Sequence, residues 1–316
     1  MPRLETRNTF FGENMEYFNG QEWKYIKDYK RGEKILTYFP KDKHVELLLP
    51  LNYIKRKSKG LNRIIFQRKL DILINDEGIF FGKYRDTGMN EYGDKIFRHD
   101  NRYMDIMTKD IPLKKSIFSH FLFINTFTYI SNNSSQLTEN KMELMLRSIM
   151  YGDIDKSNVC TLDMRDEPIE KFEKTMKPWE VLLNKCKVRY KKDVRWRTLS
   201  FSLPRDKDVF LKSVLNYSYD EIRFIVDKLD RLNDMKNKII PKDKDSLDFI
   251  QMAYTLYGIP CHKYEDYLLK MNNLGLRTDV KDMRLFRSRY EYSFTVKTGY
   301  VVLRNNGIIM VFRDYK

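Results

Sequence analysis

Two acidic segments each follow a stretch with helical periodicity. Apolar side chains recur at helical spacing over residues 142–150, and the pattern ends at Gly152–Asp153. A second pattern over 222–232 ends at Asn233–Asp234. Carboxylate and amide oxygens bind hard cations such as Mg²⁺, and a bound metal can activate water and stabilise the leaving oxygen of a phosphodiester. A single acid after a helix is usually a solvated turn residue, but two similar units that pack together would bring Asp153 close to Asn233 and Asp234.

Basic residues are concentrated in the segment 185–197, which contains one acid, Asp193, and the interleaved aromatic residues Tyr190 and Trp196. The residues of 187–201 predict a hairpin, and a two-stranded ribbon fits the major groove of DNA, where Lys and Arg reach phosphates and guanine edges. The alternative is an exposed hairpin with solvated charges. The candidate DNA contacts are Lys187, Arg189, Lys191, Lys192, Arg195 and Arg197. Lys185 is the first basic residue of the same segment but precedes the predicted hairpin.

The charge of the whole chain points the same way. The 316 residues include 59 Lys and Arg against 44 Asp and Glu, a formal net charge of +15. This excess is typical of proteins with a polyanionic partner, nucleic acid first, and net charge alone is equally consistent with a lysine-rich surface that serves only solubility.

Several classes of function are disfavoured. No apolar run approaches 18 residues and the N-terminus has no signal-peptide pattern, so neither a membrane span nor secretion is expected. The three cysteines are scattered, as in a protein of a reducing, intracellular compartment, and form no zinc or disulfide pattern. The four histidines are isolated and match no nuclease or metalloprotease motif.

The order of the elements suggests an α+β chain with an insertion. Short strands are expected over 1–85, a loop over 86–110, a strand pair or short helix over 117–130, and a linker over 131–136. Helical periods and short basic strands follow, and β structure returns over 290–316, with a hairpin turn at Asn305-Asn306-Gly307. A β module built from both termini (1–130 and 285–316) would then enclose a different domain at 137–284.

Caps predict the helix ends of the middle domain. Thr138 can cap the first helix, Ser218 and Glu221 have capping-box spacing, and Gly258 can end the helix that begins near Ser246. Pro178 predicts a kink in an amphipathic helix.

The middle domain resembles the LAGLIDADG homing endonucleases. LRSIMYGDI (146–154) resembles the first motif, with Ser148 at the small position of the helix contact and Asp153 at the metal-binding acid. FIVDKLDRLND (224–234) resembles the second motif, with Asn233 or Asp234 at the acid position and Lys228 where the family has a small residue. The resemblance implies a pseudo-symmetric αββαββα-type domain.

The flanking segments resemble the Hint fold of intein splicing domains. The matching segments are 9–38, 70–80 and 293–314, in the family's order. The splicing residues differ: Thr9 stands at the Cys or Ser nucleophile, Asn75 and Gly78 at the Thr and His of the second block, and Asp314 at the terminal Asn, preceded by Arg313. Threonine is a poor substitute for the nucleophile, so no protein splicing is expected.

The resemblance therefore implies a free-standing, intein-derived homing endonuclease, as from a phage or other mobile element. It would act as a monomer on a long site in double-stranded DNA and use Mg²⁺ or Mn²⁺ held by Asp153 and Asp234. The alternative is a DNA-binding protein on the same scaffold with impaired chemistry, because Asn233 supplies no charge to a metal.

Overall fold

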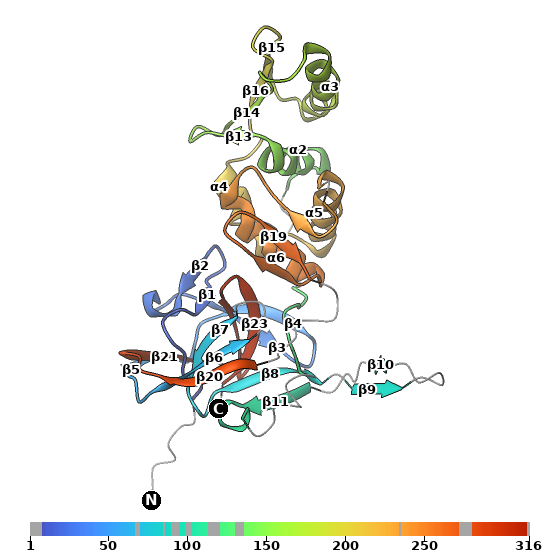
Figure 1. The fold of residues 1–316 in the computed structure, drawn as a ribbon. Helices are drawn as coiled ribbons and strands as arrows, with labels where there is room; N and C mark the ends of the chain where they lie inside the picture. Colours follow the sequence, from blue (N-terminus) through green and yellow to red (C-terminus); the bar gives the residue numbers. More distant parts are fainter. Residues whose placement is uncertain are drawn as a thin grey trace, which may run out of the picture. The chain divides into compact units, whose positions relative to one another are not determined.

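The computed structural model describes residues 8–66, 70–84, 86–89, 95–98, 103–112, 121–129, 136–233, 235–271 and 280–314, and the statements below refer to these residues. The chain is an α+β protein with several antiparallel sheets and its long helices in the middle of the sequence (Figure 1). It divides into two compact units. The outer unit comprises Met1–Tyr129, Gly258–His262 and Met271–Lys316, and the inserted unit comprises Ile130–Tyr257 and Lys263–Lys270.

The outer unit consists of strands. Its core is aromatic and aliphatic, and includes Phe11, Tyr17, Phe80 and Phe312, all of them buried. The strands are β1 (Glu16–Phe18), β2 (Trp23–Tyr25), β3 (Ile35–Phe39), β4 (His44–Leu48), β5 (Asn52–Lys57), β6 (Leu61–Phe66), β7 (Asp71–Ile74), β8 (Ile79–Tyr84), β9 (Asp86–Met89), β10 (Lys95–Arg98), β11 (Tyr103–Met107), β12 (Phe121–Phe123), β20 (Val280–Phe286), β21 (Tyr290–Thr295), β22 (Tyr300–Asn305) and β23 (Ile308–Arg313).

The two ends of the sequence share one sheet in this unit. β22 pairs with β23, with β1 and with β3, and β23 also pairs with β8, so the red C-terminal strands lie among blue and cyan ones (Figure 1). The predicted hairpin turn is confirmed, because Asn306 and Gly307 have φ values of 46° and 74°. Two consecutive positive φ angles suit the right-handed twist of the flanking strands.

The loop expected over 86–110 is wrong. β9 pairs with β10, and β11 pairs with β8 along its whole length. β11 is half-exposed: Ile106 is buried while Asp105 reaches out to Arg313 in an ion pair. Its mixed polarity therefore reflects a strand with one solvated face. In the following segment Phe121–Phe123 is a strand, whereas 113–120 lies outside the described residues.

The inserted unit contains the long helices. They are α2 (Glu139–Tyr151), α3 (Ile169–Cys186), α5 (Tyr219–Leu232) and α6 (Leu247–Tyr257), with a short α4 (Lys207–Leu211). The predicted caps are confirmed: Thr138 accepts from Lys141 N, and Ser218 and Glu221 form the capping box. Gly258, with φ at 96°, follows α6. Pro178 lies inside α3.

Four strands of the inserted unit form a separate antiparallel sheet. They are β13 (Asp153–Ile154), β14 (Val159–Asp163), β15 (Tyr190–Asp193) and β16 (Thr198–Ser202), in the order β13-β14-β16-β15. Cys160 and Leu162 of β14 and Leu199 and Phe201 of β16 are buried with the apolar side of α3. The helix therefore covers one face of this sheet.

The two halves of the inserted unit are unequal. From α2 to α4 the order is helix, two strands, helix, two strands, helix. Between α5 and α6 there is only the two-residue strand β17 (Lys238–Ile239), which pairs with β19 (Leu268–Lys270). The repetition expected from the sequence is thus complete in the first half and reduced in the second, as far as the described residues extend. Among those residues, no helix is long and apolar enough to cross a membrane.

Candidate nucleic-acid interface

The helices that precede the two candidate acids pack against each other. The hydroxyl of Tyr151, the last residue of α2, donates to the carbonyl of Leu232, the last residue of α5. The C-terminal ends of both helices therefore meet, as the paired sequence patterns predicted. Ser148 is buried, and its hydroxyl donates to the carbonyl of Leu144 at 2.8 Å within its own helix.

Lys228 has its own role in this helix contact. Its Nζ lies 2.6 Å from Oε2 of Glu143 on α2, and Arg147 Nη2 lies 2.9 Å from the other carboxylate oxygen. Partial burial raises the pKa of Glu143, but the hydrogen bonds from Lys228 and Arg147 outweigh it and hold that pKa below its usual value. A charge network thus occupies the place where the family resemblance implied a small residue.

The end of α2 is completed by a distant segment of the chain. The last carbonyls of a helix have no partner within it. Here the backbone N–H of Lys242 donates to Met150 O at 3.1 Å, and that of Asp243 donates to Ile149 O at 3.0 Å. These bonds fix the segment around 242 beside the first residues after the helix.

That arrangement places a cation on the candidate acid. Lys242 Nζ lies 2.6 Å from Oδ2 of Asp153, the first residue of β13. Both side chains are substantially exposed, 41% for the lysine and 63% for the aspartate. Lys242 was not among the functional residues predicted from the sequence.

Gly152 permits this sharp turn from helix to strand. A Cβ at this position would lie 2.2 Å from Cys160 Sγ and 3.0 Å from the carbonyl oxygen of Ser148. Burial is the main cause that raises the pKa of the Cys160 thiol to about 11, so the thiol stays protonated and packs as a small apolar group. Glycine is therefore required for close approach, since its φ of −98° is open to any residue.

The candidate acid and the basic ribbon share one row of the sheet. Asp153 is in register with Thr161, Thr161 with Ser200, and Ser200 with Lys191. Residues directly opposite on paired strands point to the same face. Because the neighbours of Thr161 and Ser200 are buried under α3, this row lies on the other face. Three strand spacings put the ends of the row roughly 14 Å apart, close to the width of a DNA major groove.

The predicted basic residues of the ribbon divide between the two faces. Lys191 is exposed on the open face, whereas Lys192 points to the helix side, with its Nζ 2.9 Å from Glu180 of α3 and above the ring of Phe172. The structure therefore does not bring Lys192 together with the other candidate DNA contacts. Lys185 belongs to α3 rather than to the ribbon.

The remaining basic residues lie at the two ends of the ribbon. Lys187, with φ at 55°, caps α3 and is exposed, as is Arg189. In the turn between β15 and β16, the guanidinium of Arg195 lies over the ring of Trp196, whose side chain is 56% exposed. Arg197 is half-buried with φ at 50°. The turn thus presents an exposed indole and a cation together.

The second candidate acid position, at Asn233 and Asp234, provides no described carboxylate for a metal. Asn233 caps the end of α5, and its amide nitrogen donates to Met235 O. Asp234 lies outside the described residues. In the described part of the chain, no group of three His, Cys, Asp or Glu side chains is arranged to hold a metal ion. Asp153 is therefore the one predicted metal ligand with a carboxylate whose surroundings are known.

The residues at the splicing positions of the outer unit do lie together. Thr9 Oγ1 donates a hydrogen bond to Arg313 O at 2.7 Å. Asn75 Oδ1 accepts one from Phe10 N at 2.9 Å, and Asn75 Nδ2 donates one to Asn8 O at 3.0 Å. The hydroxyl of Thr9 is buried and bonded to a carbonyl, with no general base among these partners.

No protein-family model matches the chain, and no curated protein matches it in sequence.

Proposed function

We propose that this chain is a DNA-binding protein of the LAGLIDADG homing-endonuclease type, which cuts or nicks double-stranded DNA at a single centre around Asp153. The observation that carries the proposal is the row from Asp153 to Lys191 on the open face of the four-stranded sheet. It joins an exposed carboxylate to a basic ribbon through two small hydroxyl side chains, which can approach a duplex closely.

On the same proposal, the inserted unit is one complete αββαββα half followed by a reduced second half. The meeting of the ends of α2 and α5 supports this, since the resemblance places its two acids there. The outer unit is proposed to be Hint-like, supported by the gathering of Thr9, Asn75 and Arg313. Thr9 lacks a thiol or primary hydroxyl, so splicing is not part of the proposed function.

A divalent cation fits this centre only with help from the substrate. Mg²⁺ is commonly held by one or two carboxylates together with phosphate oxygens and water. Asp153 supplies one exposed carboxylate, and DNA phosphates would supply the rest. When bound, the metal would activate water and stabilise the leaving oxygen. Lys242 neutralises Asp153 in the free protein and is placed to donate to a phosphate oxygen when DNA is bound.

Incubation with DNA of the source genome, in Mg²⁺ and in Mn²⁺, tests the proposal when the new ends are mapped by sequencing. Discrete ends that vanish in Asp153→Asn are expected. Asp208→Asn, an exposed acid of α4, is the matched control and should cleave normally. Random ends, or the same ends with Asp153→Asn, would contradict the site.

A second candidate function is sequence-specific DNA binding without cleavage. The observations that favour it are the ion pair that already occupies Asp153 and the neutral Asn233 at the second position. This alternative predicts tight, salt-sensitive gel shifts with no strand scission in either metal. The same incubation therefore separates the two candidates.

A further inference from the structure

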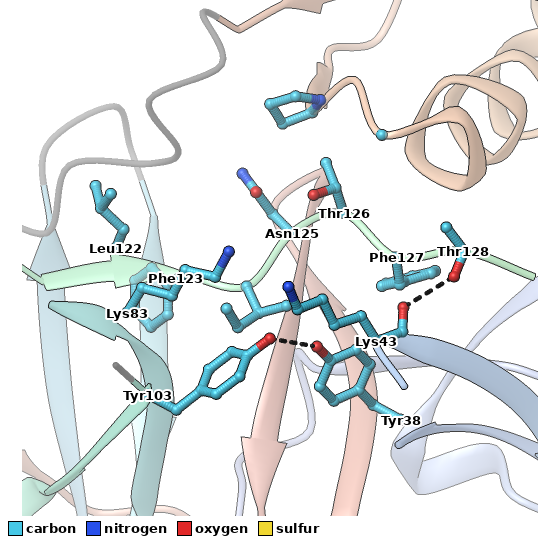
Figure 2. A pocket seen from close by; sticks show the side chains of 13 residues that line it. Tyr38, Lys43, Lys83, Tyr103, Leu122, Phe123, Asn125, Thr126, Phe127 and Thr128 are labelled. Carbon is cyan, nitrogen blue, oxygen red and sulfur yellow. Dashed lines mark hydrogen bonds between the residues drawn. The ribbon is translucent and has the colours of Figure 1, made fainter. Parts of the chain in front are cut away.

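A cavity of about 250 Å³ lies within the outer unit, and none of its described lining residues belongs to the proposed nuclease centre. It is lined by strands β3, β8, β11 and β12, by the turn after β3, by the segment that follows β12, and by Gly258 and Pro260 (Figure 2). Its polar side chains are those of Tyr38, Lys43, Lys83, Tyr103, Asn125 and Thr126, beside Thr128. Of the described residues that line it, none is an Asp or a Glu.

The side chains of two lysines line this cavity. Figure 2 shows the side chains of Lys43 and Lys83 entering it from separate elements. Lys43 occupies a turn with φ at 56°, which is held by Thr128 through two hydrogen bonds to the Lys43 carbonyl. Burial, and then the nearby Lys43 ammonium, lower the pKa of Lys83. Among the described residues neither lysine has an ion pair. Lys43 is exposed, and the ammonium of Lys83 lies 5.8 Å from the centre of the Tyr103 ring, so no carboxylate offsets the two charges there.

A buried amide also lacks a partner here. Asn125 is only 6% exposed, and its Nδ2 has no hydrogen-bond partner among the described residues. A buried donor without a partner is unfavourable, so it points to a group that is bound in use.

The phenols at the floor of the cavity supply another donor. The hydroxyls of Tyr38 and Tyr103 are 3.4 Å apart, so one donates to the other and one O–H is left over. Burial, followed by the bond to Tyr103, raises the pKa of Tyr38, which keeps that phenol protonated. The polar side chains of the lining can each donate a hydrogen bond or carry positive charge, and the rest of the lining is mainly apolar.

We propose that this cavity binds a phosphate dianion, either inorganic phosphate or the terminal phosphate of a small phosphomonoester. Donors from several directions match a tetrahedral oxyanion better than a planar carboxylate, and two ammonium groups balance the charge of about −1.5 to −2 that a phosphomonoester carries at neutral pH. The volume holds several times the roughly 30 Å³ of a water molecule yet falls below that of drug-sized sites, which limits the attached group to a small one.

Titration calorimetry at constant ionic strength tests the proposal with inorganic phosphate and with glycerol phosphate, and with chloride as the blank. Lys83→Gln is expected to weaken binding of both by about tenfold or more, the usual loss for a hydrogen bond to a charged group. Lys41→Gln, an exposed lysine two residues from Lys43, is the matched control and should bind like the wild type.

Absence of saturable binding by the wild type, or equal binding by Lys83→Gln, would overturn the proposal. If only duplex DNA loses affinity in Lys83→Gln, the cavity is a DNA contact and the small-ligand proposal is also overturned. If Lys83→Gln fails to fold, acylation of the lysines of the wild type in the presence of phosphate tests the site instead. Phosphate should protect Lys83 from the reagent and leave Lys41 reactive. Equal labelling of both lysines would contradict the site.

Discussion

Lys242 Nζ lies 2.6 Å from Oδ2 of Asp153, although the two residues are 89 positions apart in the sequence. The contact exists because the backbone N–H groups of Lys242 and Asp243 complete the end of α2. The acid that follows the helix therefore belongs to a pair whose cation comes from the second half of the inserted unit.

Removal of the Lys242 ammonium group should affect the cleavage rate and the free energy of unfolding differently. Lys242→Ala should change the free energy of unfolding by less than about 1 kcal/mol, since exposed ion pairs contribute little. It should nevertheless lower the cleavage rate, because a donor to the phosphate is lost. Rates and urea melts of Lys242→Ala and of the control Lys244→Ala, whose partner is Asp266, measure both quantities. Normal cleavage by Lys242→Ala would remove Lys242 from the site.

The two neighbouring lysines of β15 provide a second test. Lys191→Ala should weaken DNA binding and reduce the salt dependence by about one released counterion, because its side chain lies on the open face. Lys192→Ala should leave DNA binding nearly unchanged and lower stability slightly, since this lysine bonds Glu180 on the helix side. Fluorescence anisotropy across a salt series distinguishes the two, and equal losses would mean that the assigned faces are wrong.

Gly152 should not tolerate a side chain. In Gly152→Ala the new Cβ meets Cys160 Sγ and the Ser148 carbonyl, which should cost about 1–3 kcal/mol, as overpacking does. Cys160→Ala removes the nearer clash, so the double variant should recover part of that loss. Thermal melts of the four proteins in this cycle give the coupling energy, and purely additive losses would rule out the steric account.

The network around Glu143 should make stability depend on acid pH. The folded-state pKa of Glu143 is lowered, so its contribution is present above the unfolded value of about 4.3 and is lost as the pH falls through the folded value. Glu143→Gln should therefore be less stable than the wild type at neutral pH, with a smaller difference at low pH. Urea melts from neutral to acid pH would show this convergence. A constant difference across that range would exclude the linkage.

Local patterns predicted local structure well in this chain. The caps at Thr138 and Ser218 and the turn at Asn306–Gly307 depend on neighbouring residues, and they are confirmed. The strand β11 was missed because pairing with β8 determines it more than its own composition does. The partner of Asp153 could not be predicted, since no periodicity relates positions 153 and 242. Strand geometry alone puts Lys191 and Lys192 on opposite faces, but which of the two faces is open followed only from the cover by α3.

The most direct test is cleavage of a supercoiled plasmid that carries the mapped site, by the wild type and by Asp153→Asn. With one carboxylate at the centre, the wild type should produce nicked circles with a break in one defined strand, dependent on Mg²⁺ or Mn²⁺. Asp153→Asn should still shift the same DNA on a gel and leave the plasmid supercoiled. Nicking by Asp153→Asn at the wild-type rate would contradict the assignment of Asp153 as the cleavage centre.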